Sequence, residues 1–85
     1  MFYTYVIQGS DKRLYVGYSS DLKERIKKHF SRGVYTTKRM GNLKLIFYEA
    51  FISEKDAKRR EKYFKTTKGK RTLKLMLVHS LGPVV

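Results

Sequence analysis

The stretch that decides the fold reads Leu14-Tyr15-Val16-Gly17-Tyr18-Ser19-Ser20-Asp21-Leu22-Lys23-Glu24-Arg25. Its first residues are apolar or aromatic and predict a strand, which we expect to turn at residues 17–20. Asp21 and, three residues later, Glu24 form a capping box, in which each side chain accepts an otherwise unpaired backbone N–H at a helix start. The strand therefore brings Tyr15, and the helix brings Arg25, to one neighbourhood.

Length and composition predict one small domain over residues 1–85, because no linker rich in proline, glycine or serine divides the chain. The absence of cysteine excludes a disulfide framework and a thiolate-bound zinc site. The N-terminus lacks the features of a signal peptide, and no apolar run approaches membrane-spanning length. We expect a cytoplasmic protein that does not bind membranes.

The net charge is +13, from 20 Lys and Arg against 7 Asp and Glu. So large a positive field predicts nucleic acid as the partner, with DNA preferred, although charge alone does not separate DNA from RNA, a ribosome or an anionic membrane. The positive charge is concentrated in residues 57–74, where Glu61 is the one acid among nine basic side chains: Lys58, Arg59, Arg60, Lys62, Lys65, Lys68, Lys70, Arg71 and Lys74.

The first two strands, residues 2–8 and 13–18, form a hairpin whose register is open. Pairing of Gln8 with Arg13 puts Tyr5 and Tyr15 on opposite faces of the sheet. Pairing of Gln8 with Lys12, through a bulged loop, puts the two tyrosines side by side. A shared site needs the second arrangement or one close to it.

The first helix runs from residue 22 to 30 or 31, and we expect Leu22, Ile26 and Phe30 to form its buried stripe. Arg25 and His29 fall together along one edge of that stripe. Such an arginine either points into a cleft or covers apolar surface with its stem.

A polar loop over residues 31–42 then leads to a third strand over 43–51, which we expect to be largely buried. A second helix begins after the Ser53 cap, and Gly69 separates it from a third helix over 72–81 whose stripe includes Leu73 and Met76. Gly82-Pro83 ends that helix. The predicted fold class is α+β, a small three-stranded, mainly antiparallel sheet flanked by three helices in the order β-β-α-β-α-α.

Glu61 falls on the apolar side of the second helix, with Ala57 and Phe64. A carboxylate in that position needs a partner, since burying an unpaired charge is costly. The alternatives are an ion pair with a neighbouring lysine or arginine, a divalent cation, or a proton; among so many cations, the ion pair is the plain expectation.

Taken together, Tyr3-Thr4-Tyr5, Tyr15-Val16-Gly17 ten residues later, Arg25, His29 and the later Ala57 with Arg60-Glu61-Lys62 resemble the GIY-YIG nuclease domain. The resemblance covers nearly the whole chain and is closest to small stand-alone bacterial members. The chain departs from the pattern at Tyr3 and Thr4, where the family name has glycine and isoleucine. It also departs at Tyr18, where the repair-nuclease relatives carry a lysine.

The resemblance implies a metal-dependent endonuclease acting on DNA phosphodiester bonds, with a role in DNA repair or processing. Glu61 would bind one Mg²⁺ or Mn²⁺, Arg25 would contact the scissile phosphate, Tyr5 would help deprotonate the attacking water, and Tyr15 would position the phosphate region. His29 is the second candidate for proton transfer, and Gly17 would allow a close approach at the turn. The phosphate-binding residues would be Lys38, Arg39, Arg60, Lys62, Lys65 and Lys68.

Two other functions compete with the endonuclease. The first is a nucleic-acid-binding module that keeps the nuclease fold without efficient cleavage, which Tyr18 favours. The second, a structural accessory of a larger assembly, rests only on size and charge.

Overall fold

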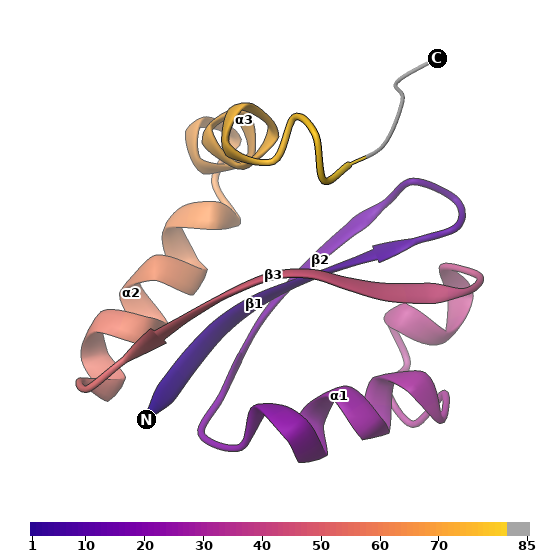
Figure 1. The fold of residues 1–85 in the computed structure, drawn as a ribbon, viewed down its shortest axis with the longest axis horizontal. Helices are drawn as coiled ribbons and strands as arrows, with labels where there is room; N and C mark the ends of the chain where they lie inside the picture. The colour runs from indigo at the N-terminus through magenta and orange to yellow at the C-terminus, as the bar shows by residue number, and fades with distance from the viewer. Residues whose placement is uncertain (82–85) are drawn as a thin grey trace.

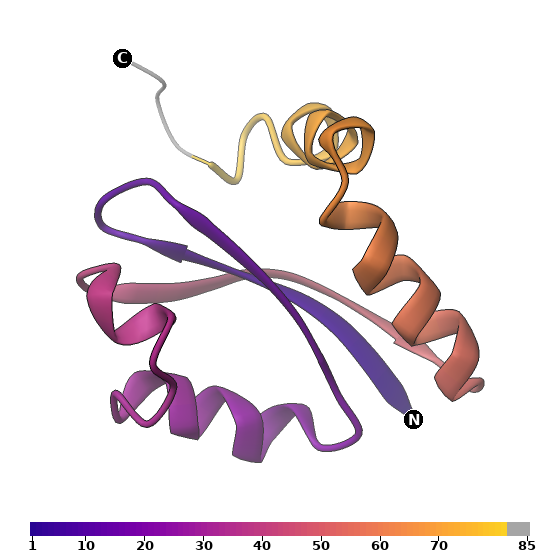
Figure 2. The ribbon, with the colours of Figure 1, turned by 180° about the vertical axis from the view of Figure 1, so that it is seen from behind.

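The computed structural model describes residues 1–81 and confirms the α+β class and the β-β-α-β-α-α order. Its elements are β1 (Phe2–Gly9), β2 (Leu14–Ser19), α1 (Leu22–Phe30), the short 3-10 helix η1 (Thr37–Arg39), β3 (Leu43–Phe51), α2 (Glu54–Phe64) and α3 (Thr67–Met76). The strands form one antiparallel sheet in the order β2-β1-β3. Helix α1 lies on one side of the sheet, and α2 and α3 lie on the other, as the two opposite views show (Figure 1 and Figure 2). In residues 1–81, no helix combines the length and the apolarity needed to span a bilayer.

The hairpin register differs from both expected pairings, because Gln8 pairs with Leu14. Tyr5 consequently lies opposite Gly17, and Ile7 lies opposite Tyr15. This register is two residues away from the second expected pairing. Because side chains alternate with a period of two, Tyr5 and Tyr15 still share a face. The longer connection is closed by a hydrogen bond of 3.0 Å from the Gly9 N–H to the Arg13 carbonyl.

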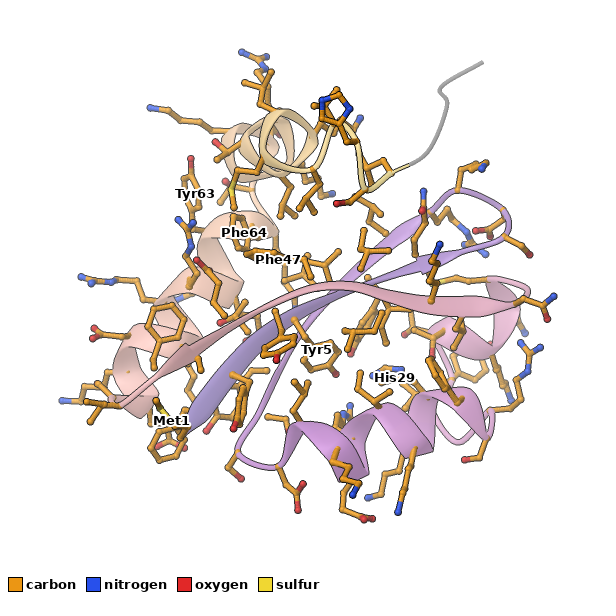
Figure 3. All side chains as sticks on the ribbon, in the orientation of Figure 1. Met1, Tyr5, His29, Phe47, Tyr63 and Phe64 are labelled. Carbon is orange, nitrogen blue, oxygen red and sulfur yellow. The ribbon has the colours of Figure 1, made fainter. Side chains whose placement is uncertain are left out.

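The two faces of the sheet have different contents. The face under α2 and α3 holds the hydrophobic core, in which Val6 and Val16 pack against Phe64, Leu73 and Leu77. Figure 3 shows Phe47 and Phe64 on this side, whereas Tyr5 and His29 lie between the sheet and α1. The α1 face is therefore the one that gathers chemically reactive groups.

The sequence placed the start of α1 and of α2 correctly, since their caps are local. The Asp21 carboxylate accepts a hydrogen bond of 3.2 Å from the Glu24 N–H, and the Ser53 hydroxyl accepts one of 3.4 Å from the Asp56 N–H. Only this half of the first capping box forms, because the Asp21 N–H donates to Ser19 instead, at 2.9 Å.

Two burial expectations were wrong. In α1, Phe30 is 51% exposed and His29 is fully buried, so the helix turns the Arg25–His29 edge toward the sheet. Strand β3 has no fully buried residue, because it forms an edge of the sheet. The central strand β1 contributes the fully buried stretch, residues 4–7, instead.

The third helix begins at Thr67, five residues before its expected start, so that Gly69 lies inside it. A Cβ at Gly69 would overlap the Tyr63 carbonyl, and the glycine therefore marks close contact between α2 and α3 rather than a break. Leu73 is buried as expected, but Met76 is 42% exposed and is not a core residue. The helix also ends at Met76, with Leu77 as its C-cap, instead of at residue 81 as expected; the Gly82-Pro83 stop itself lies outside the described residues.

Candidate active site

Tyr5 lies at the centre of the α1 face, on the middle strand of the sheet. Its ring extends across Gly17 on the neighbouring strand, where a Cβ would overlap the ring and the hydroxyl. Gly17 therefore lies within β2, not in a turn as expected, and the group that approaches it closely is the Tyr5 phenol. The chain leaves β2 after Ser19, and Asp21 caps α1.

A chain of hydrogen bonds runs from α1 through the Tyr5 hydroxyl into the loop after α1. Arg25 donates from Nε to the Tyr5 hydroxyl at 3.3 Å, and that hydroxyl lies 2.8 Å from His29 Nε2. His29 Nδ1 lies 2.7 Å from the Thr37 hydroxyl, which donates to the Val34 carbonyl at 3.4 Å. With the imidazole proton on Nδ1, every hydrogen in this chain has an acceptor. Tyr5 then donates to His29, and His29 donates to Thr37.

Burial fixes the protonation states of this chain. It raises the pKa of Tyr5 to about 12, against the opposing effect of the Arg25 hydrogen bond. It also lowers the pKa of His29 to about 4, with a further contribution from the Arg25 charge. The hydrogen bond to Tyr5 raises the pKa of Arg25. At neutral pH the site therefore holds a neutral phenol, a neutral imidazole and a guanidinium cation.

Tyr15 completes this cluster from β2. Its ring centroid lies 5.0 Å from that of His29 in an edge-to-face arrangement and 6.3 Å from that of Tyr5. Tyr15 is half-buried, whereas Tyr5 and His29 have no exposed surface. Tyr5, Tyr15, Arg25 and His29, four of the residues singled out from the sequence, therefore form one contact cluster.

Glu61 approaches from α2, on the other side of the sheet. Its carboxylate, 24% exposed, pairs with the Lys65 ammonium at 3.0 Å, which is the ion pair among the three sequence alternatives. Within residues 1–81 no hydrogen bond or ion pair joins Glu61 to the other four site residues. It nevertheless acts electrostatically on Tyr5: burial is the main cause of the raised pKa of Tyr5, and the charge of Glu61 adds to it.

No group of three or more His, Asp or Glu side chains within residues 1–81 could hold a metal ion. Glu61 is thus a single carboxylate, and it opens onto a hollow of about 640 Å³ lined by Lys58, Arg59, Glu61, Lys62 and Lys65. Mg²⁺ commonly keeps several waters and takes only one or two protein carboxylates, so one acid beside a hollow lined by cationic side chains fits such an ion.

The predicted phosphate-binding residues fall into four places. Lys38 and Arg39 lie in η1, with both cationic groups over the Tyr35 ring. Lys62 and Lys65 line the Glu61 hollow, and Lys68 is exposed on α3. Arg60 is engaged elsewhere: it donates to Glu49 at 2.8 Å and lies over the Phe64 ring, so it is not available to a phosphate.

Thr37 is the site residue that sequence reasoning missed. It is fully buried and holds the far nitrogen of His29, but it belongs to a polar loop in which no periodic pattern marks a buried position. Tyr18 makes two further contacts that sequence reasoning did not predict. Its hydroxyl donates to Glu54 at 2.6 Å, and Lys58 lies over its ring. The hydrogen bond to Glu54 raises the pKa of Tyr18 to about 12, with a smaller contribution from Glu61.

The chain is similar to known proteins in sequence and in structure. The chain matches the GIY-YIG catalytic domain over residues 1–74. It is 37% identical over 81 residues to the UPF0213 protein CPE1444 of Clostridium perfringens, and the aligned region covers 94% of this chain and 85% of that protein. It is 41% identical over 64 residues to the UPF0213 protein SAG0778 of Streptococcus agalactiae, and the aligned region covers 74% of this chain and 73% of that protein.

A solved structure is also similar. The solution NMR structure of the UPF0213 protein BH0048 from Bacillus halodurans matches with a TM-score of 0.57 and 33% identity, over 98% of this chain and 89% of that one. The family match covers the strands, α1, α2, most of α3 and all five candidate residues of the site. The chain therefore belongs to the GIY-YIG catalytic domain family, among small bacterial UPF0213 proteins.

Proposed function

We propose that this protein is a divalent-metal-dependent endonuclease that hydrolyses DNA phosphodiester bonds. The observation that carries the proposal is the convergence of Arg25, Tyr5, His29 and Tyr15 around one buried hydroxyl, within the electrostatic reach of Glu61. Phosphoryl chemistry uses a guanidinium to stabilise charge on the phosphate, and imidazole and phenol groups to move protons.

Arg25 is the group that meets the phosphate. It is half-buried, stays charged, and pairs with no carboxylate in the described part of the chain. Its present acceptor is a neutral phenol, a weaker partner than a phosphate anion. A scissile phosphate would therefore draw the guanidinium off Tyr5, and Arg25 would stabilise the charge that develops on the phosphoryl oxygens.

The same movement exposes Tyr5. A water molecule cannot reach the hydroxyl while Tyr5 has no exposed surface, so phosphate binding by Arg25 precedes proton transfer. Because its pKa is about 12, Tyr5 is a base only if it gives up its own proton as it takes one from water. His29 Nε2, 2.8 Å away, is placed to accept that proton.

Glu61 would hold the metal ion. Its ion pair with Lys65 joins residues i and i+4 on a helix and is partly exposed, so it is worth only about 0.3–0.5 kcal/mol, which a divalent cation readily overcomes. The bound ion would orient the phosphate and offset charge on the leaving oxygen. Lys58 and Lys62, beside Glu61, are placed to contact adjacent phosphates.

Nicking of supercoiled plasmid in Mg²⁺ or Mn²⁺ tests the proposal. We expect Arg25→Ala and Glu61→Gln each to slow nicking about 100-fold or more, the usual cost of removing a group that stabilises transition-state charge. Lys23→Ala and Glu24→Gln change matched charges on the exposed side of α1 and should nick at the wild-type rate. Unchanged nicking by both site variants would refute the assignment.

A non-catalytic DNA-binding module is the second candidate, favoured by the full burial of Tyr5 and by the Glu61–Lys65 ion pair. This module would bind DNA with an affinity that falls steeply with salt, and no metal would produce cleavage. Metal-dependent turnover that requires Glu61 eliminates it.

A further inference from the structure

Tyr35, in the loop between α1 and β3, is an aromatic side chain that neither the core nor the proposed catalysis uses. It is 64% exposed. Two cations lie over its ring: Lys38 Nζ and Arg39 Cζ are each 4.8 Å from the ring centroid. Within the described residues, no carboxylate forms an ion pair with Lys38 or Arg39. Both cations are therefore available to phosphates.

The loop that presents Tyr35 is held in place by the rest of the protein. Arg32 donates to the Gly41 carbonyl at 2.6 Å, and Arg13 from the hairpin donates to the Arg39 carbonyl at 2.8 Å. Met40 and Thr37 anchor the loop from beneath, since both are buried. Two arginine hydrogen bonds and two buried side chains therefore fix the loop. Its outer surface carries the Tyr35 ring with the two cations over it.

The loop is also joined directly to the candidate active site. Thr37, two residues after Tyr35, contacts His29 at 2.7 Å, and His29 contacts Tyr5 at 2.8 Å. Two residues of chain span at most about 7 Å. A nucleotide on Tyr35 would therefore lie within a few nucleotides of a phosphate held by Arg25.

We propose that Tyr35, Lys38 and Arg39 form a stacking subsite for an unpaired DNA base, so that the substrate carries a single-stranded segment beside the cleaved bond. The substrate assignment rests on the proposed endonuclease function, whereas the binding subsite does not. Each of the two exposed cation–π contacts is worth about 0.5–1 kcal/mol, so a base that displaces both forfeits about 1–2 kcal/mol. Stacking of the base on the ring contributes about 1–3 kcal/mol, and the displaced cations gain phosphate contacts. A base would therefore take the ring face, and the displaced cations would bind its flanking phosphates.

Paired DNA does not offer this contact, because each base of a duplex already stacks on its neighbours and its extrusion costs a few kcal/mol. The subsite would thus discriminate by strand state rather than by sequence, since every base has a face that stacks. Duplex DNA would still bind through phosphate contacts alone, with Lys38 and Arg39 contributing charge.

Fluorescence anisotropy without divalent metal, which prevents cleavage, tests the subsite with a labelled single strand and a blunt duplex of equal length. We expect Tyr35→Ala to weaken binding of the single strand about 5- to 150-fold, the fold-change that corresponds to the loss of one stacked base, with little change for the duplex. Tyr35→Phe should bind like wild type. Tyr48→Ala, which removes an exposed tyrosine of β3 with no cation over its ring, is the matched control.

Equal binding of the single strand by Tyr35→Ala and wild type, or equal losses on both DNAs, would overturn the subsite. Tighter binding of an RNA of the same sequence, with the same dependence on Tyr35, would overturn its assignment to DNA. In Mg²⁺, a duplex with a single-stranded gap should be cut near the gap by wild type and more slowly by Tyr35→Ala. A failed endonuclease function shows as no cleavage of any DNA, whereas a failed subsite shows as unchanged metal-free binding.

Discussion

The phenol of Tyr5 occupies the space that a side chain at position 17 would fill. Gly17 is its partner in the hairpin, and the absence of a Cβ there lets the ring lie flat across β2 toward Arg25 and His29. The glycine is thus a requirement of the site rather than of the backbone, since Gly17 does not adopt a positive φ.

Gly17→Ala is therefore expected to displace Tyr5. Overpacking of a filled interior costs about 1–3 kcal/mol, and the shifted hydroxyl would lose its alignment with His29. Urea unfolding should show this loss in free energy of unfolding, and plasmid nicking should fall in parallel. Gly33→Ala is the control, because its nearest new contact is the Lys28 carbonyl at 3.2 Å and no ring is displaced. Nicking and stability both at wild-type level in Gly17→Ala would show that Tyr5 does not need this space.

The buried histidine predicts a specific acid instability. The pKa of His29 is about 4 in the folded state against an ordinary 6.5, because burial, and then the Arg25 charge, oppose its protonation. The unfolded chain therefore takes up the proton first as pH falls. Neutral His29 therefore makes its full contribution to the free energy of unfolding above pH 6.5. This contribution, about 3 kcal/mol, is lost between about pH 6.5 and 4.

Chemical unfolding at a series of pH values measures this loss. His29→Gln should flatten the slope between pH 6.5 and 4, since glutamine does not titrate. His79→Gln removes the exposed histidine of the described chain and should leave the slope as in wild type. A slope that survives in His29→Gln would mean that other groups, such as the carboxylates Asp11 and Glu54 with their lowered pKa values, cause the acid loss.

Arg25→Lys separates charge from geometry. Lysine keeps the positive charge but lacks the planar fork that meets two phosphate oxygens. We expect nicking about 100-fold slower than wild type, and a change in free energy of unfolding below about 1 kcal/mol, since a half-buried side chain loses little packing. Lys28→Ala, on the exposed face of α1, should leave both unchanged. Full activity in Arg25→Lys would show that a point charge suffices.

Lys65 is expected to compete with the metal ion for Glu61. Removing a pair worth about 0.3–0.5 kcal/mol should lower the Mg²⁺ concentration for half-maximal nicking about twofold in Lys65→Ala. Lys62→Ala removes the same charge from the same hollow without breaking an ion pair and is the matched control. An identical shift in both variants would attribute the effect to the general field, and a higher Mg²⁺ requirement in Lys65→Ala would contradict the competition.

Much of the fold could be predicted from the sequence, because local hydrogen bonds determine where helices begin. The Asp21 and Ser53 caps each bond an N–H three residues ahead, so the starts of α1 and α2 depend on a few neighbouring residues. The strand boundaries at Leu43 and Phe51 follow a composition change that is equally local. The family motif gave Tyr5, Tyr15, Arg25 and His29, which the structure brings into one cluster.

Most features of the fold that the sequence did not predict depended on contacts between residues far apart in the chain. The rotation of α1 that buries His29 and exposes Phe30 is set by the chain of hydrogen bonds to Tyr5 and Thr37, not by the apolar period. The early start of α3 is an exception, because a local cap sets it: the Thr66 hydroxyl accepts a hydrogen bond of 2.9 Å from the Gly69 N–H. The periodic pattern of apolar residues predicts neither the rotation of α1 nor the start of α3.

The sequence by itself therefore determined the order and ends of most elements and the residue types of the site. Tertiary structure alone decided the hairpin register, the burial of His29 and the engagement of Arg60 by Glu49. The physical reason is the range of the interactions: caps and propensities act within a few residues, whereas register and side-chain pairing are set by which surfaces the folded chain brings together.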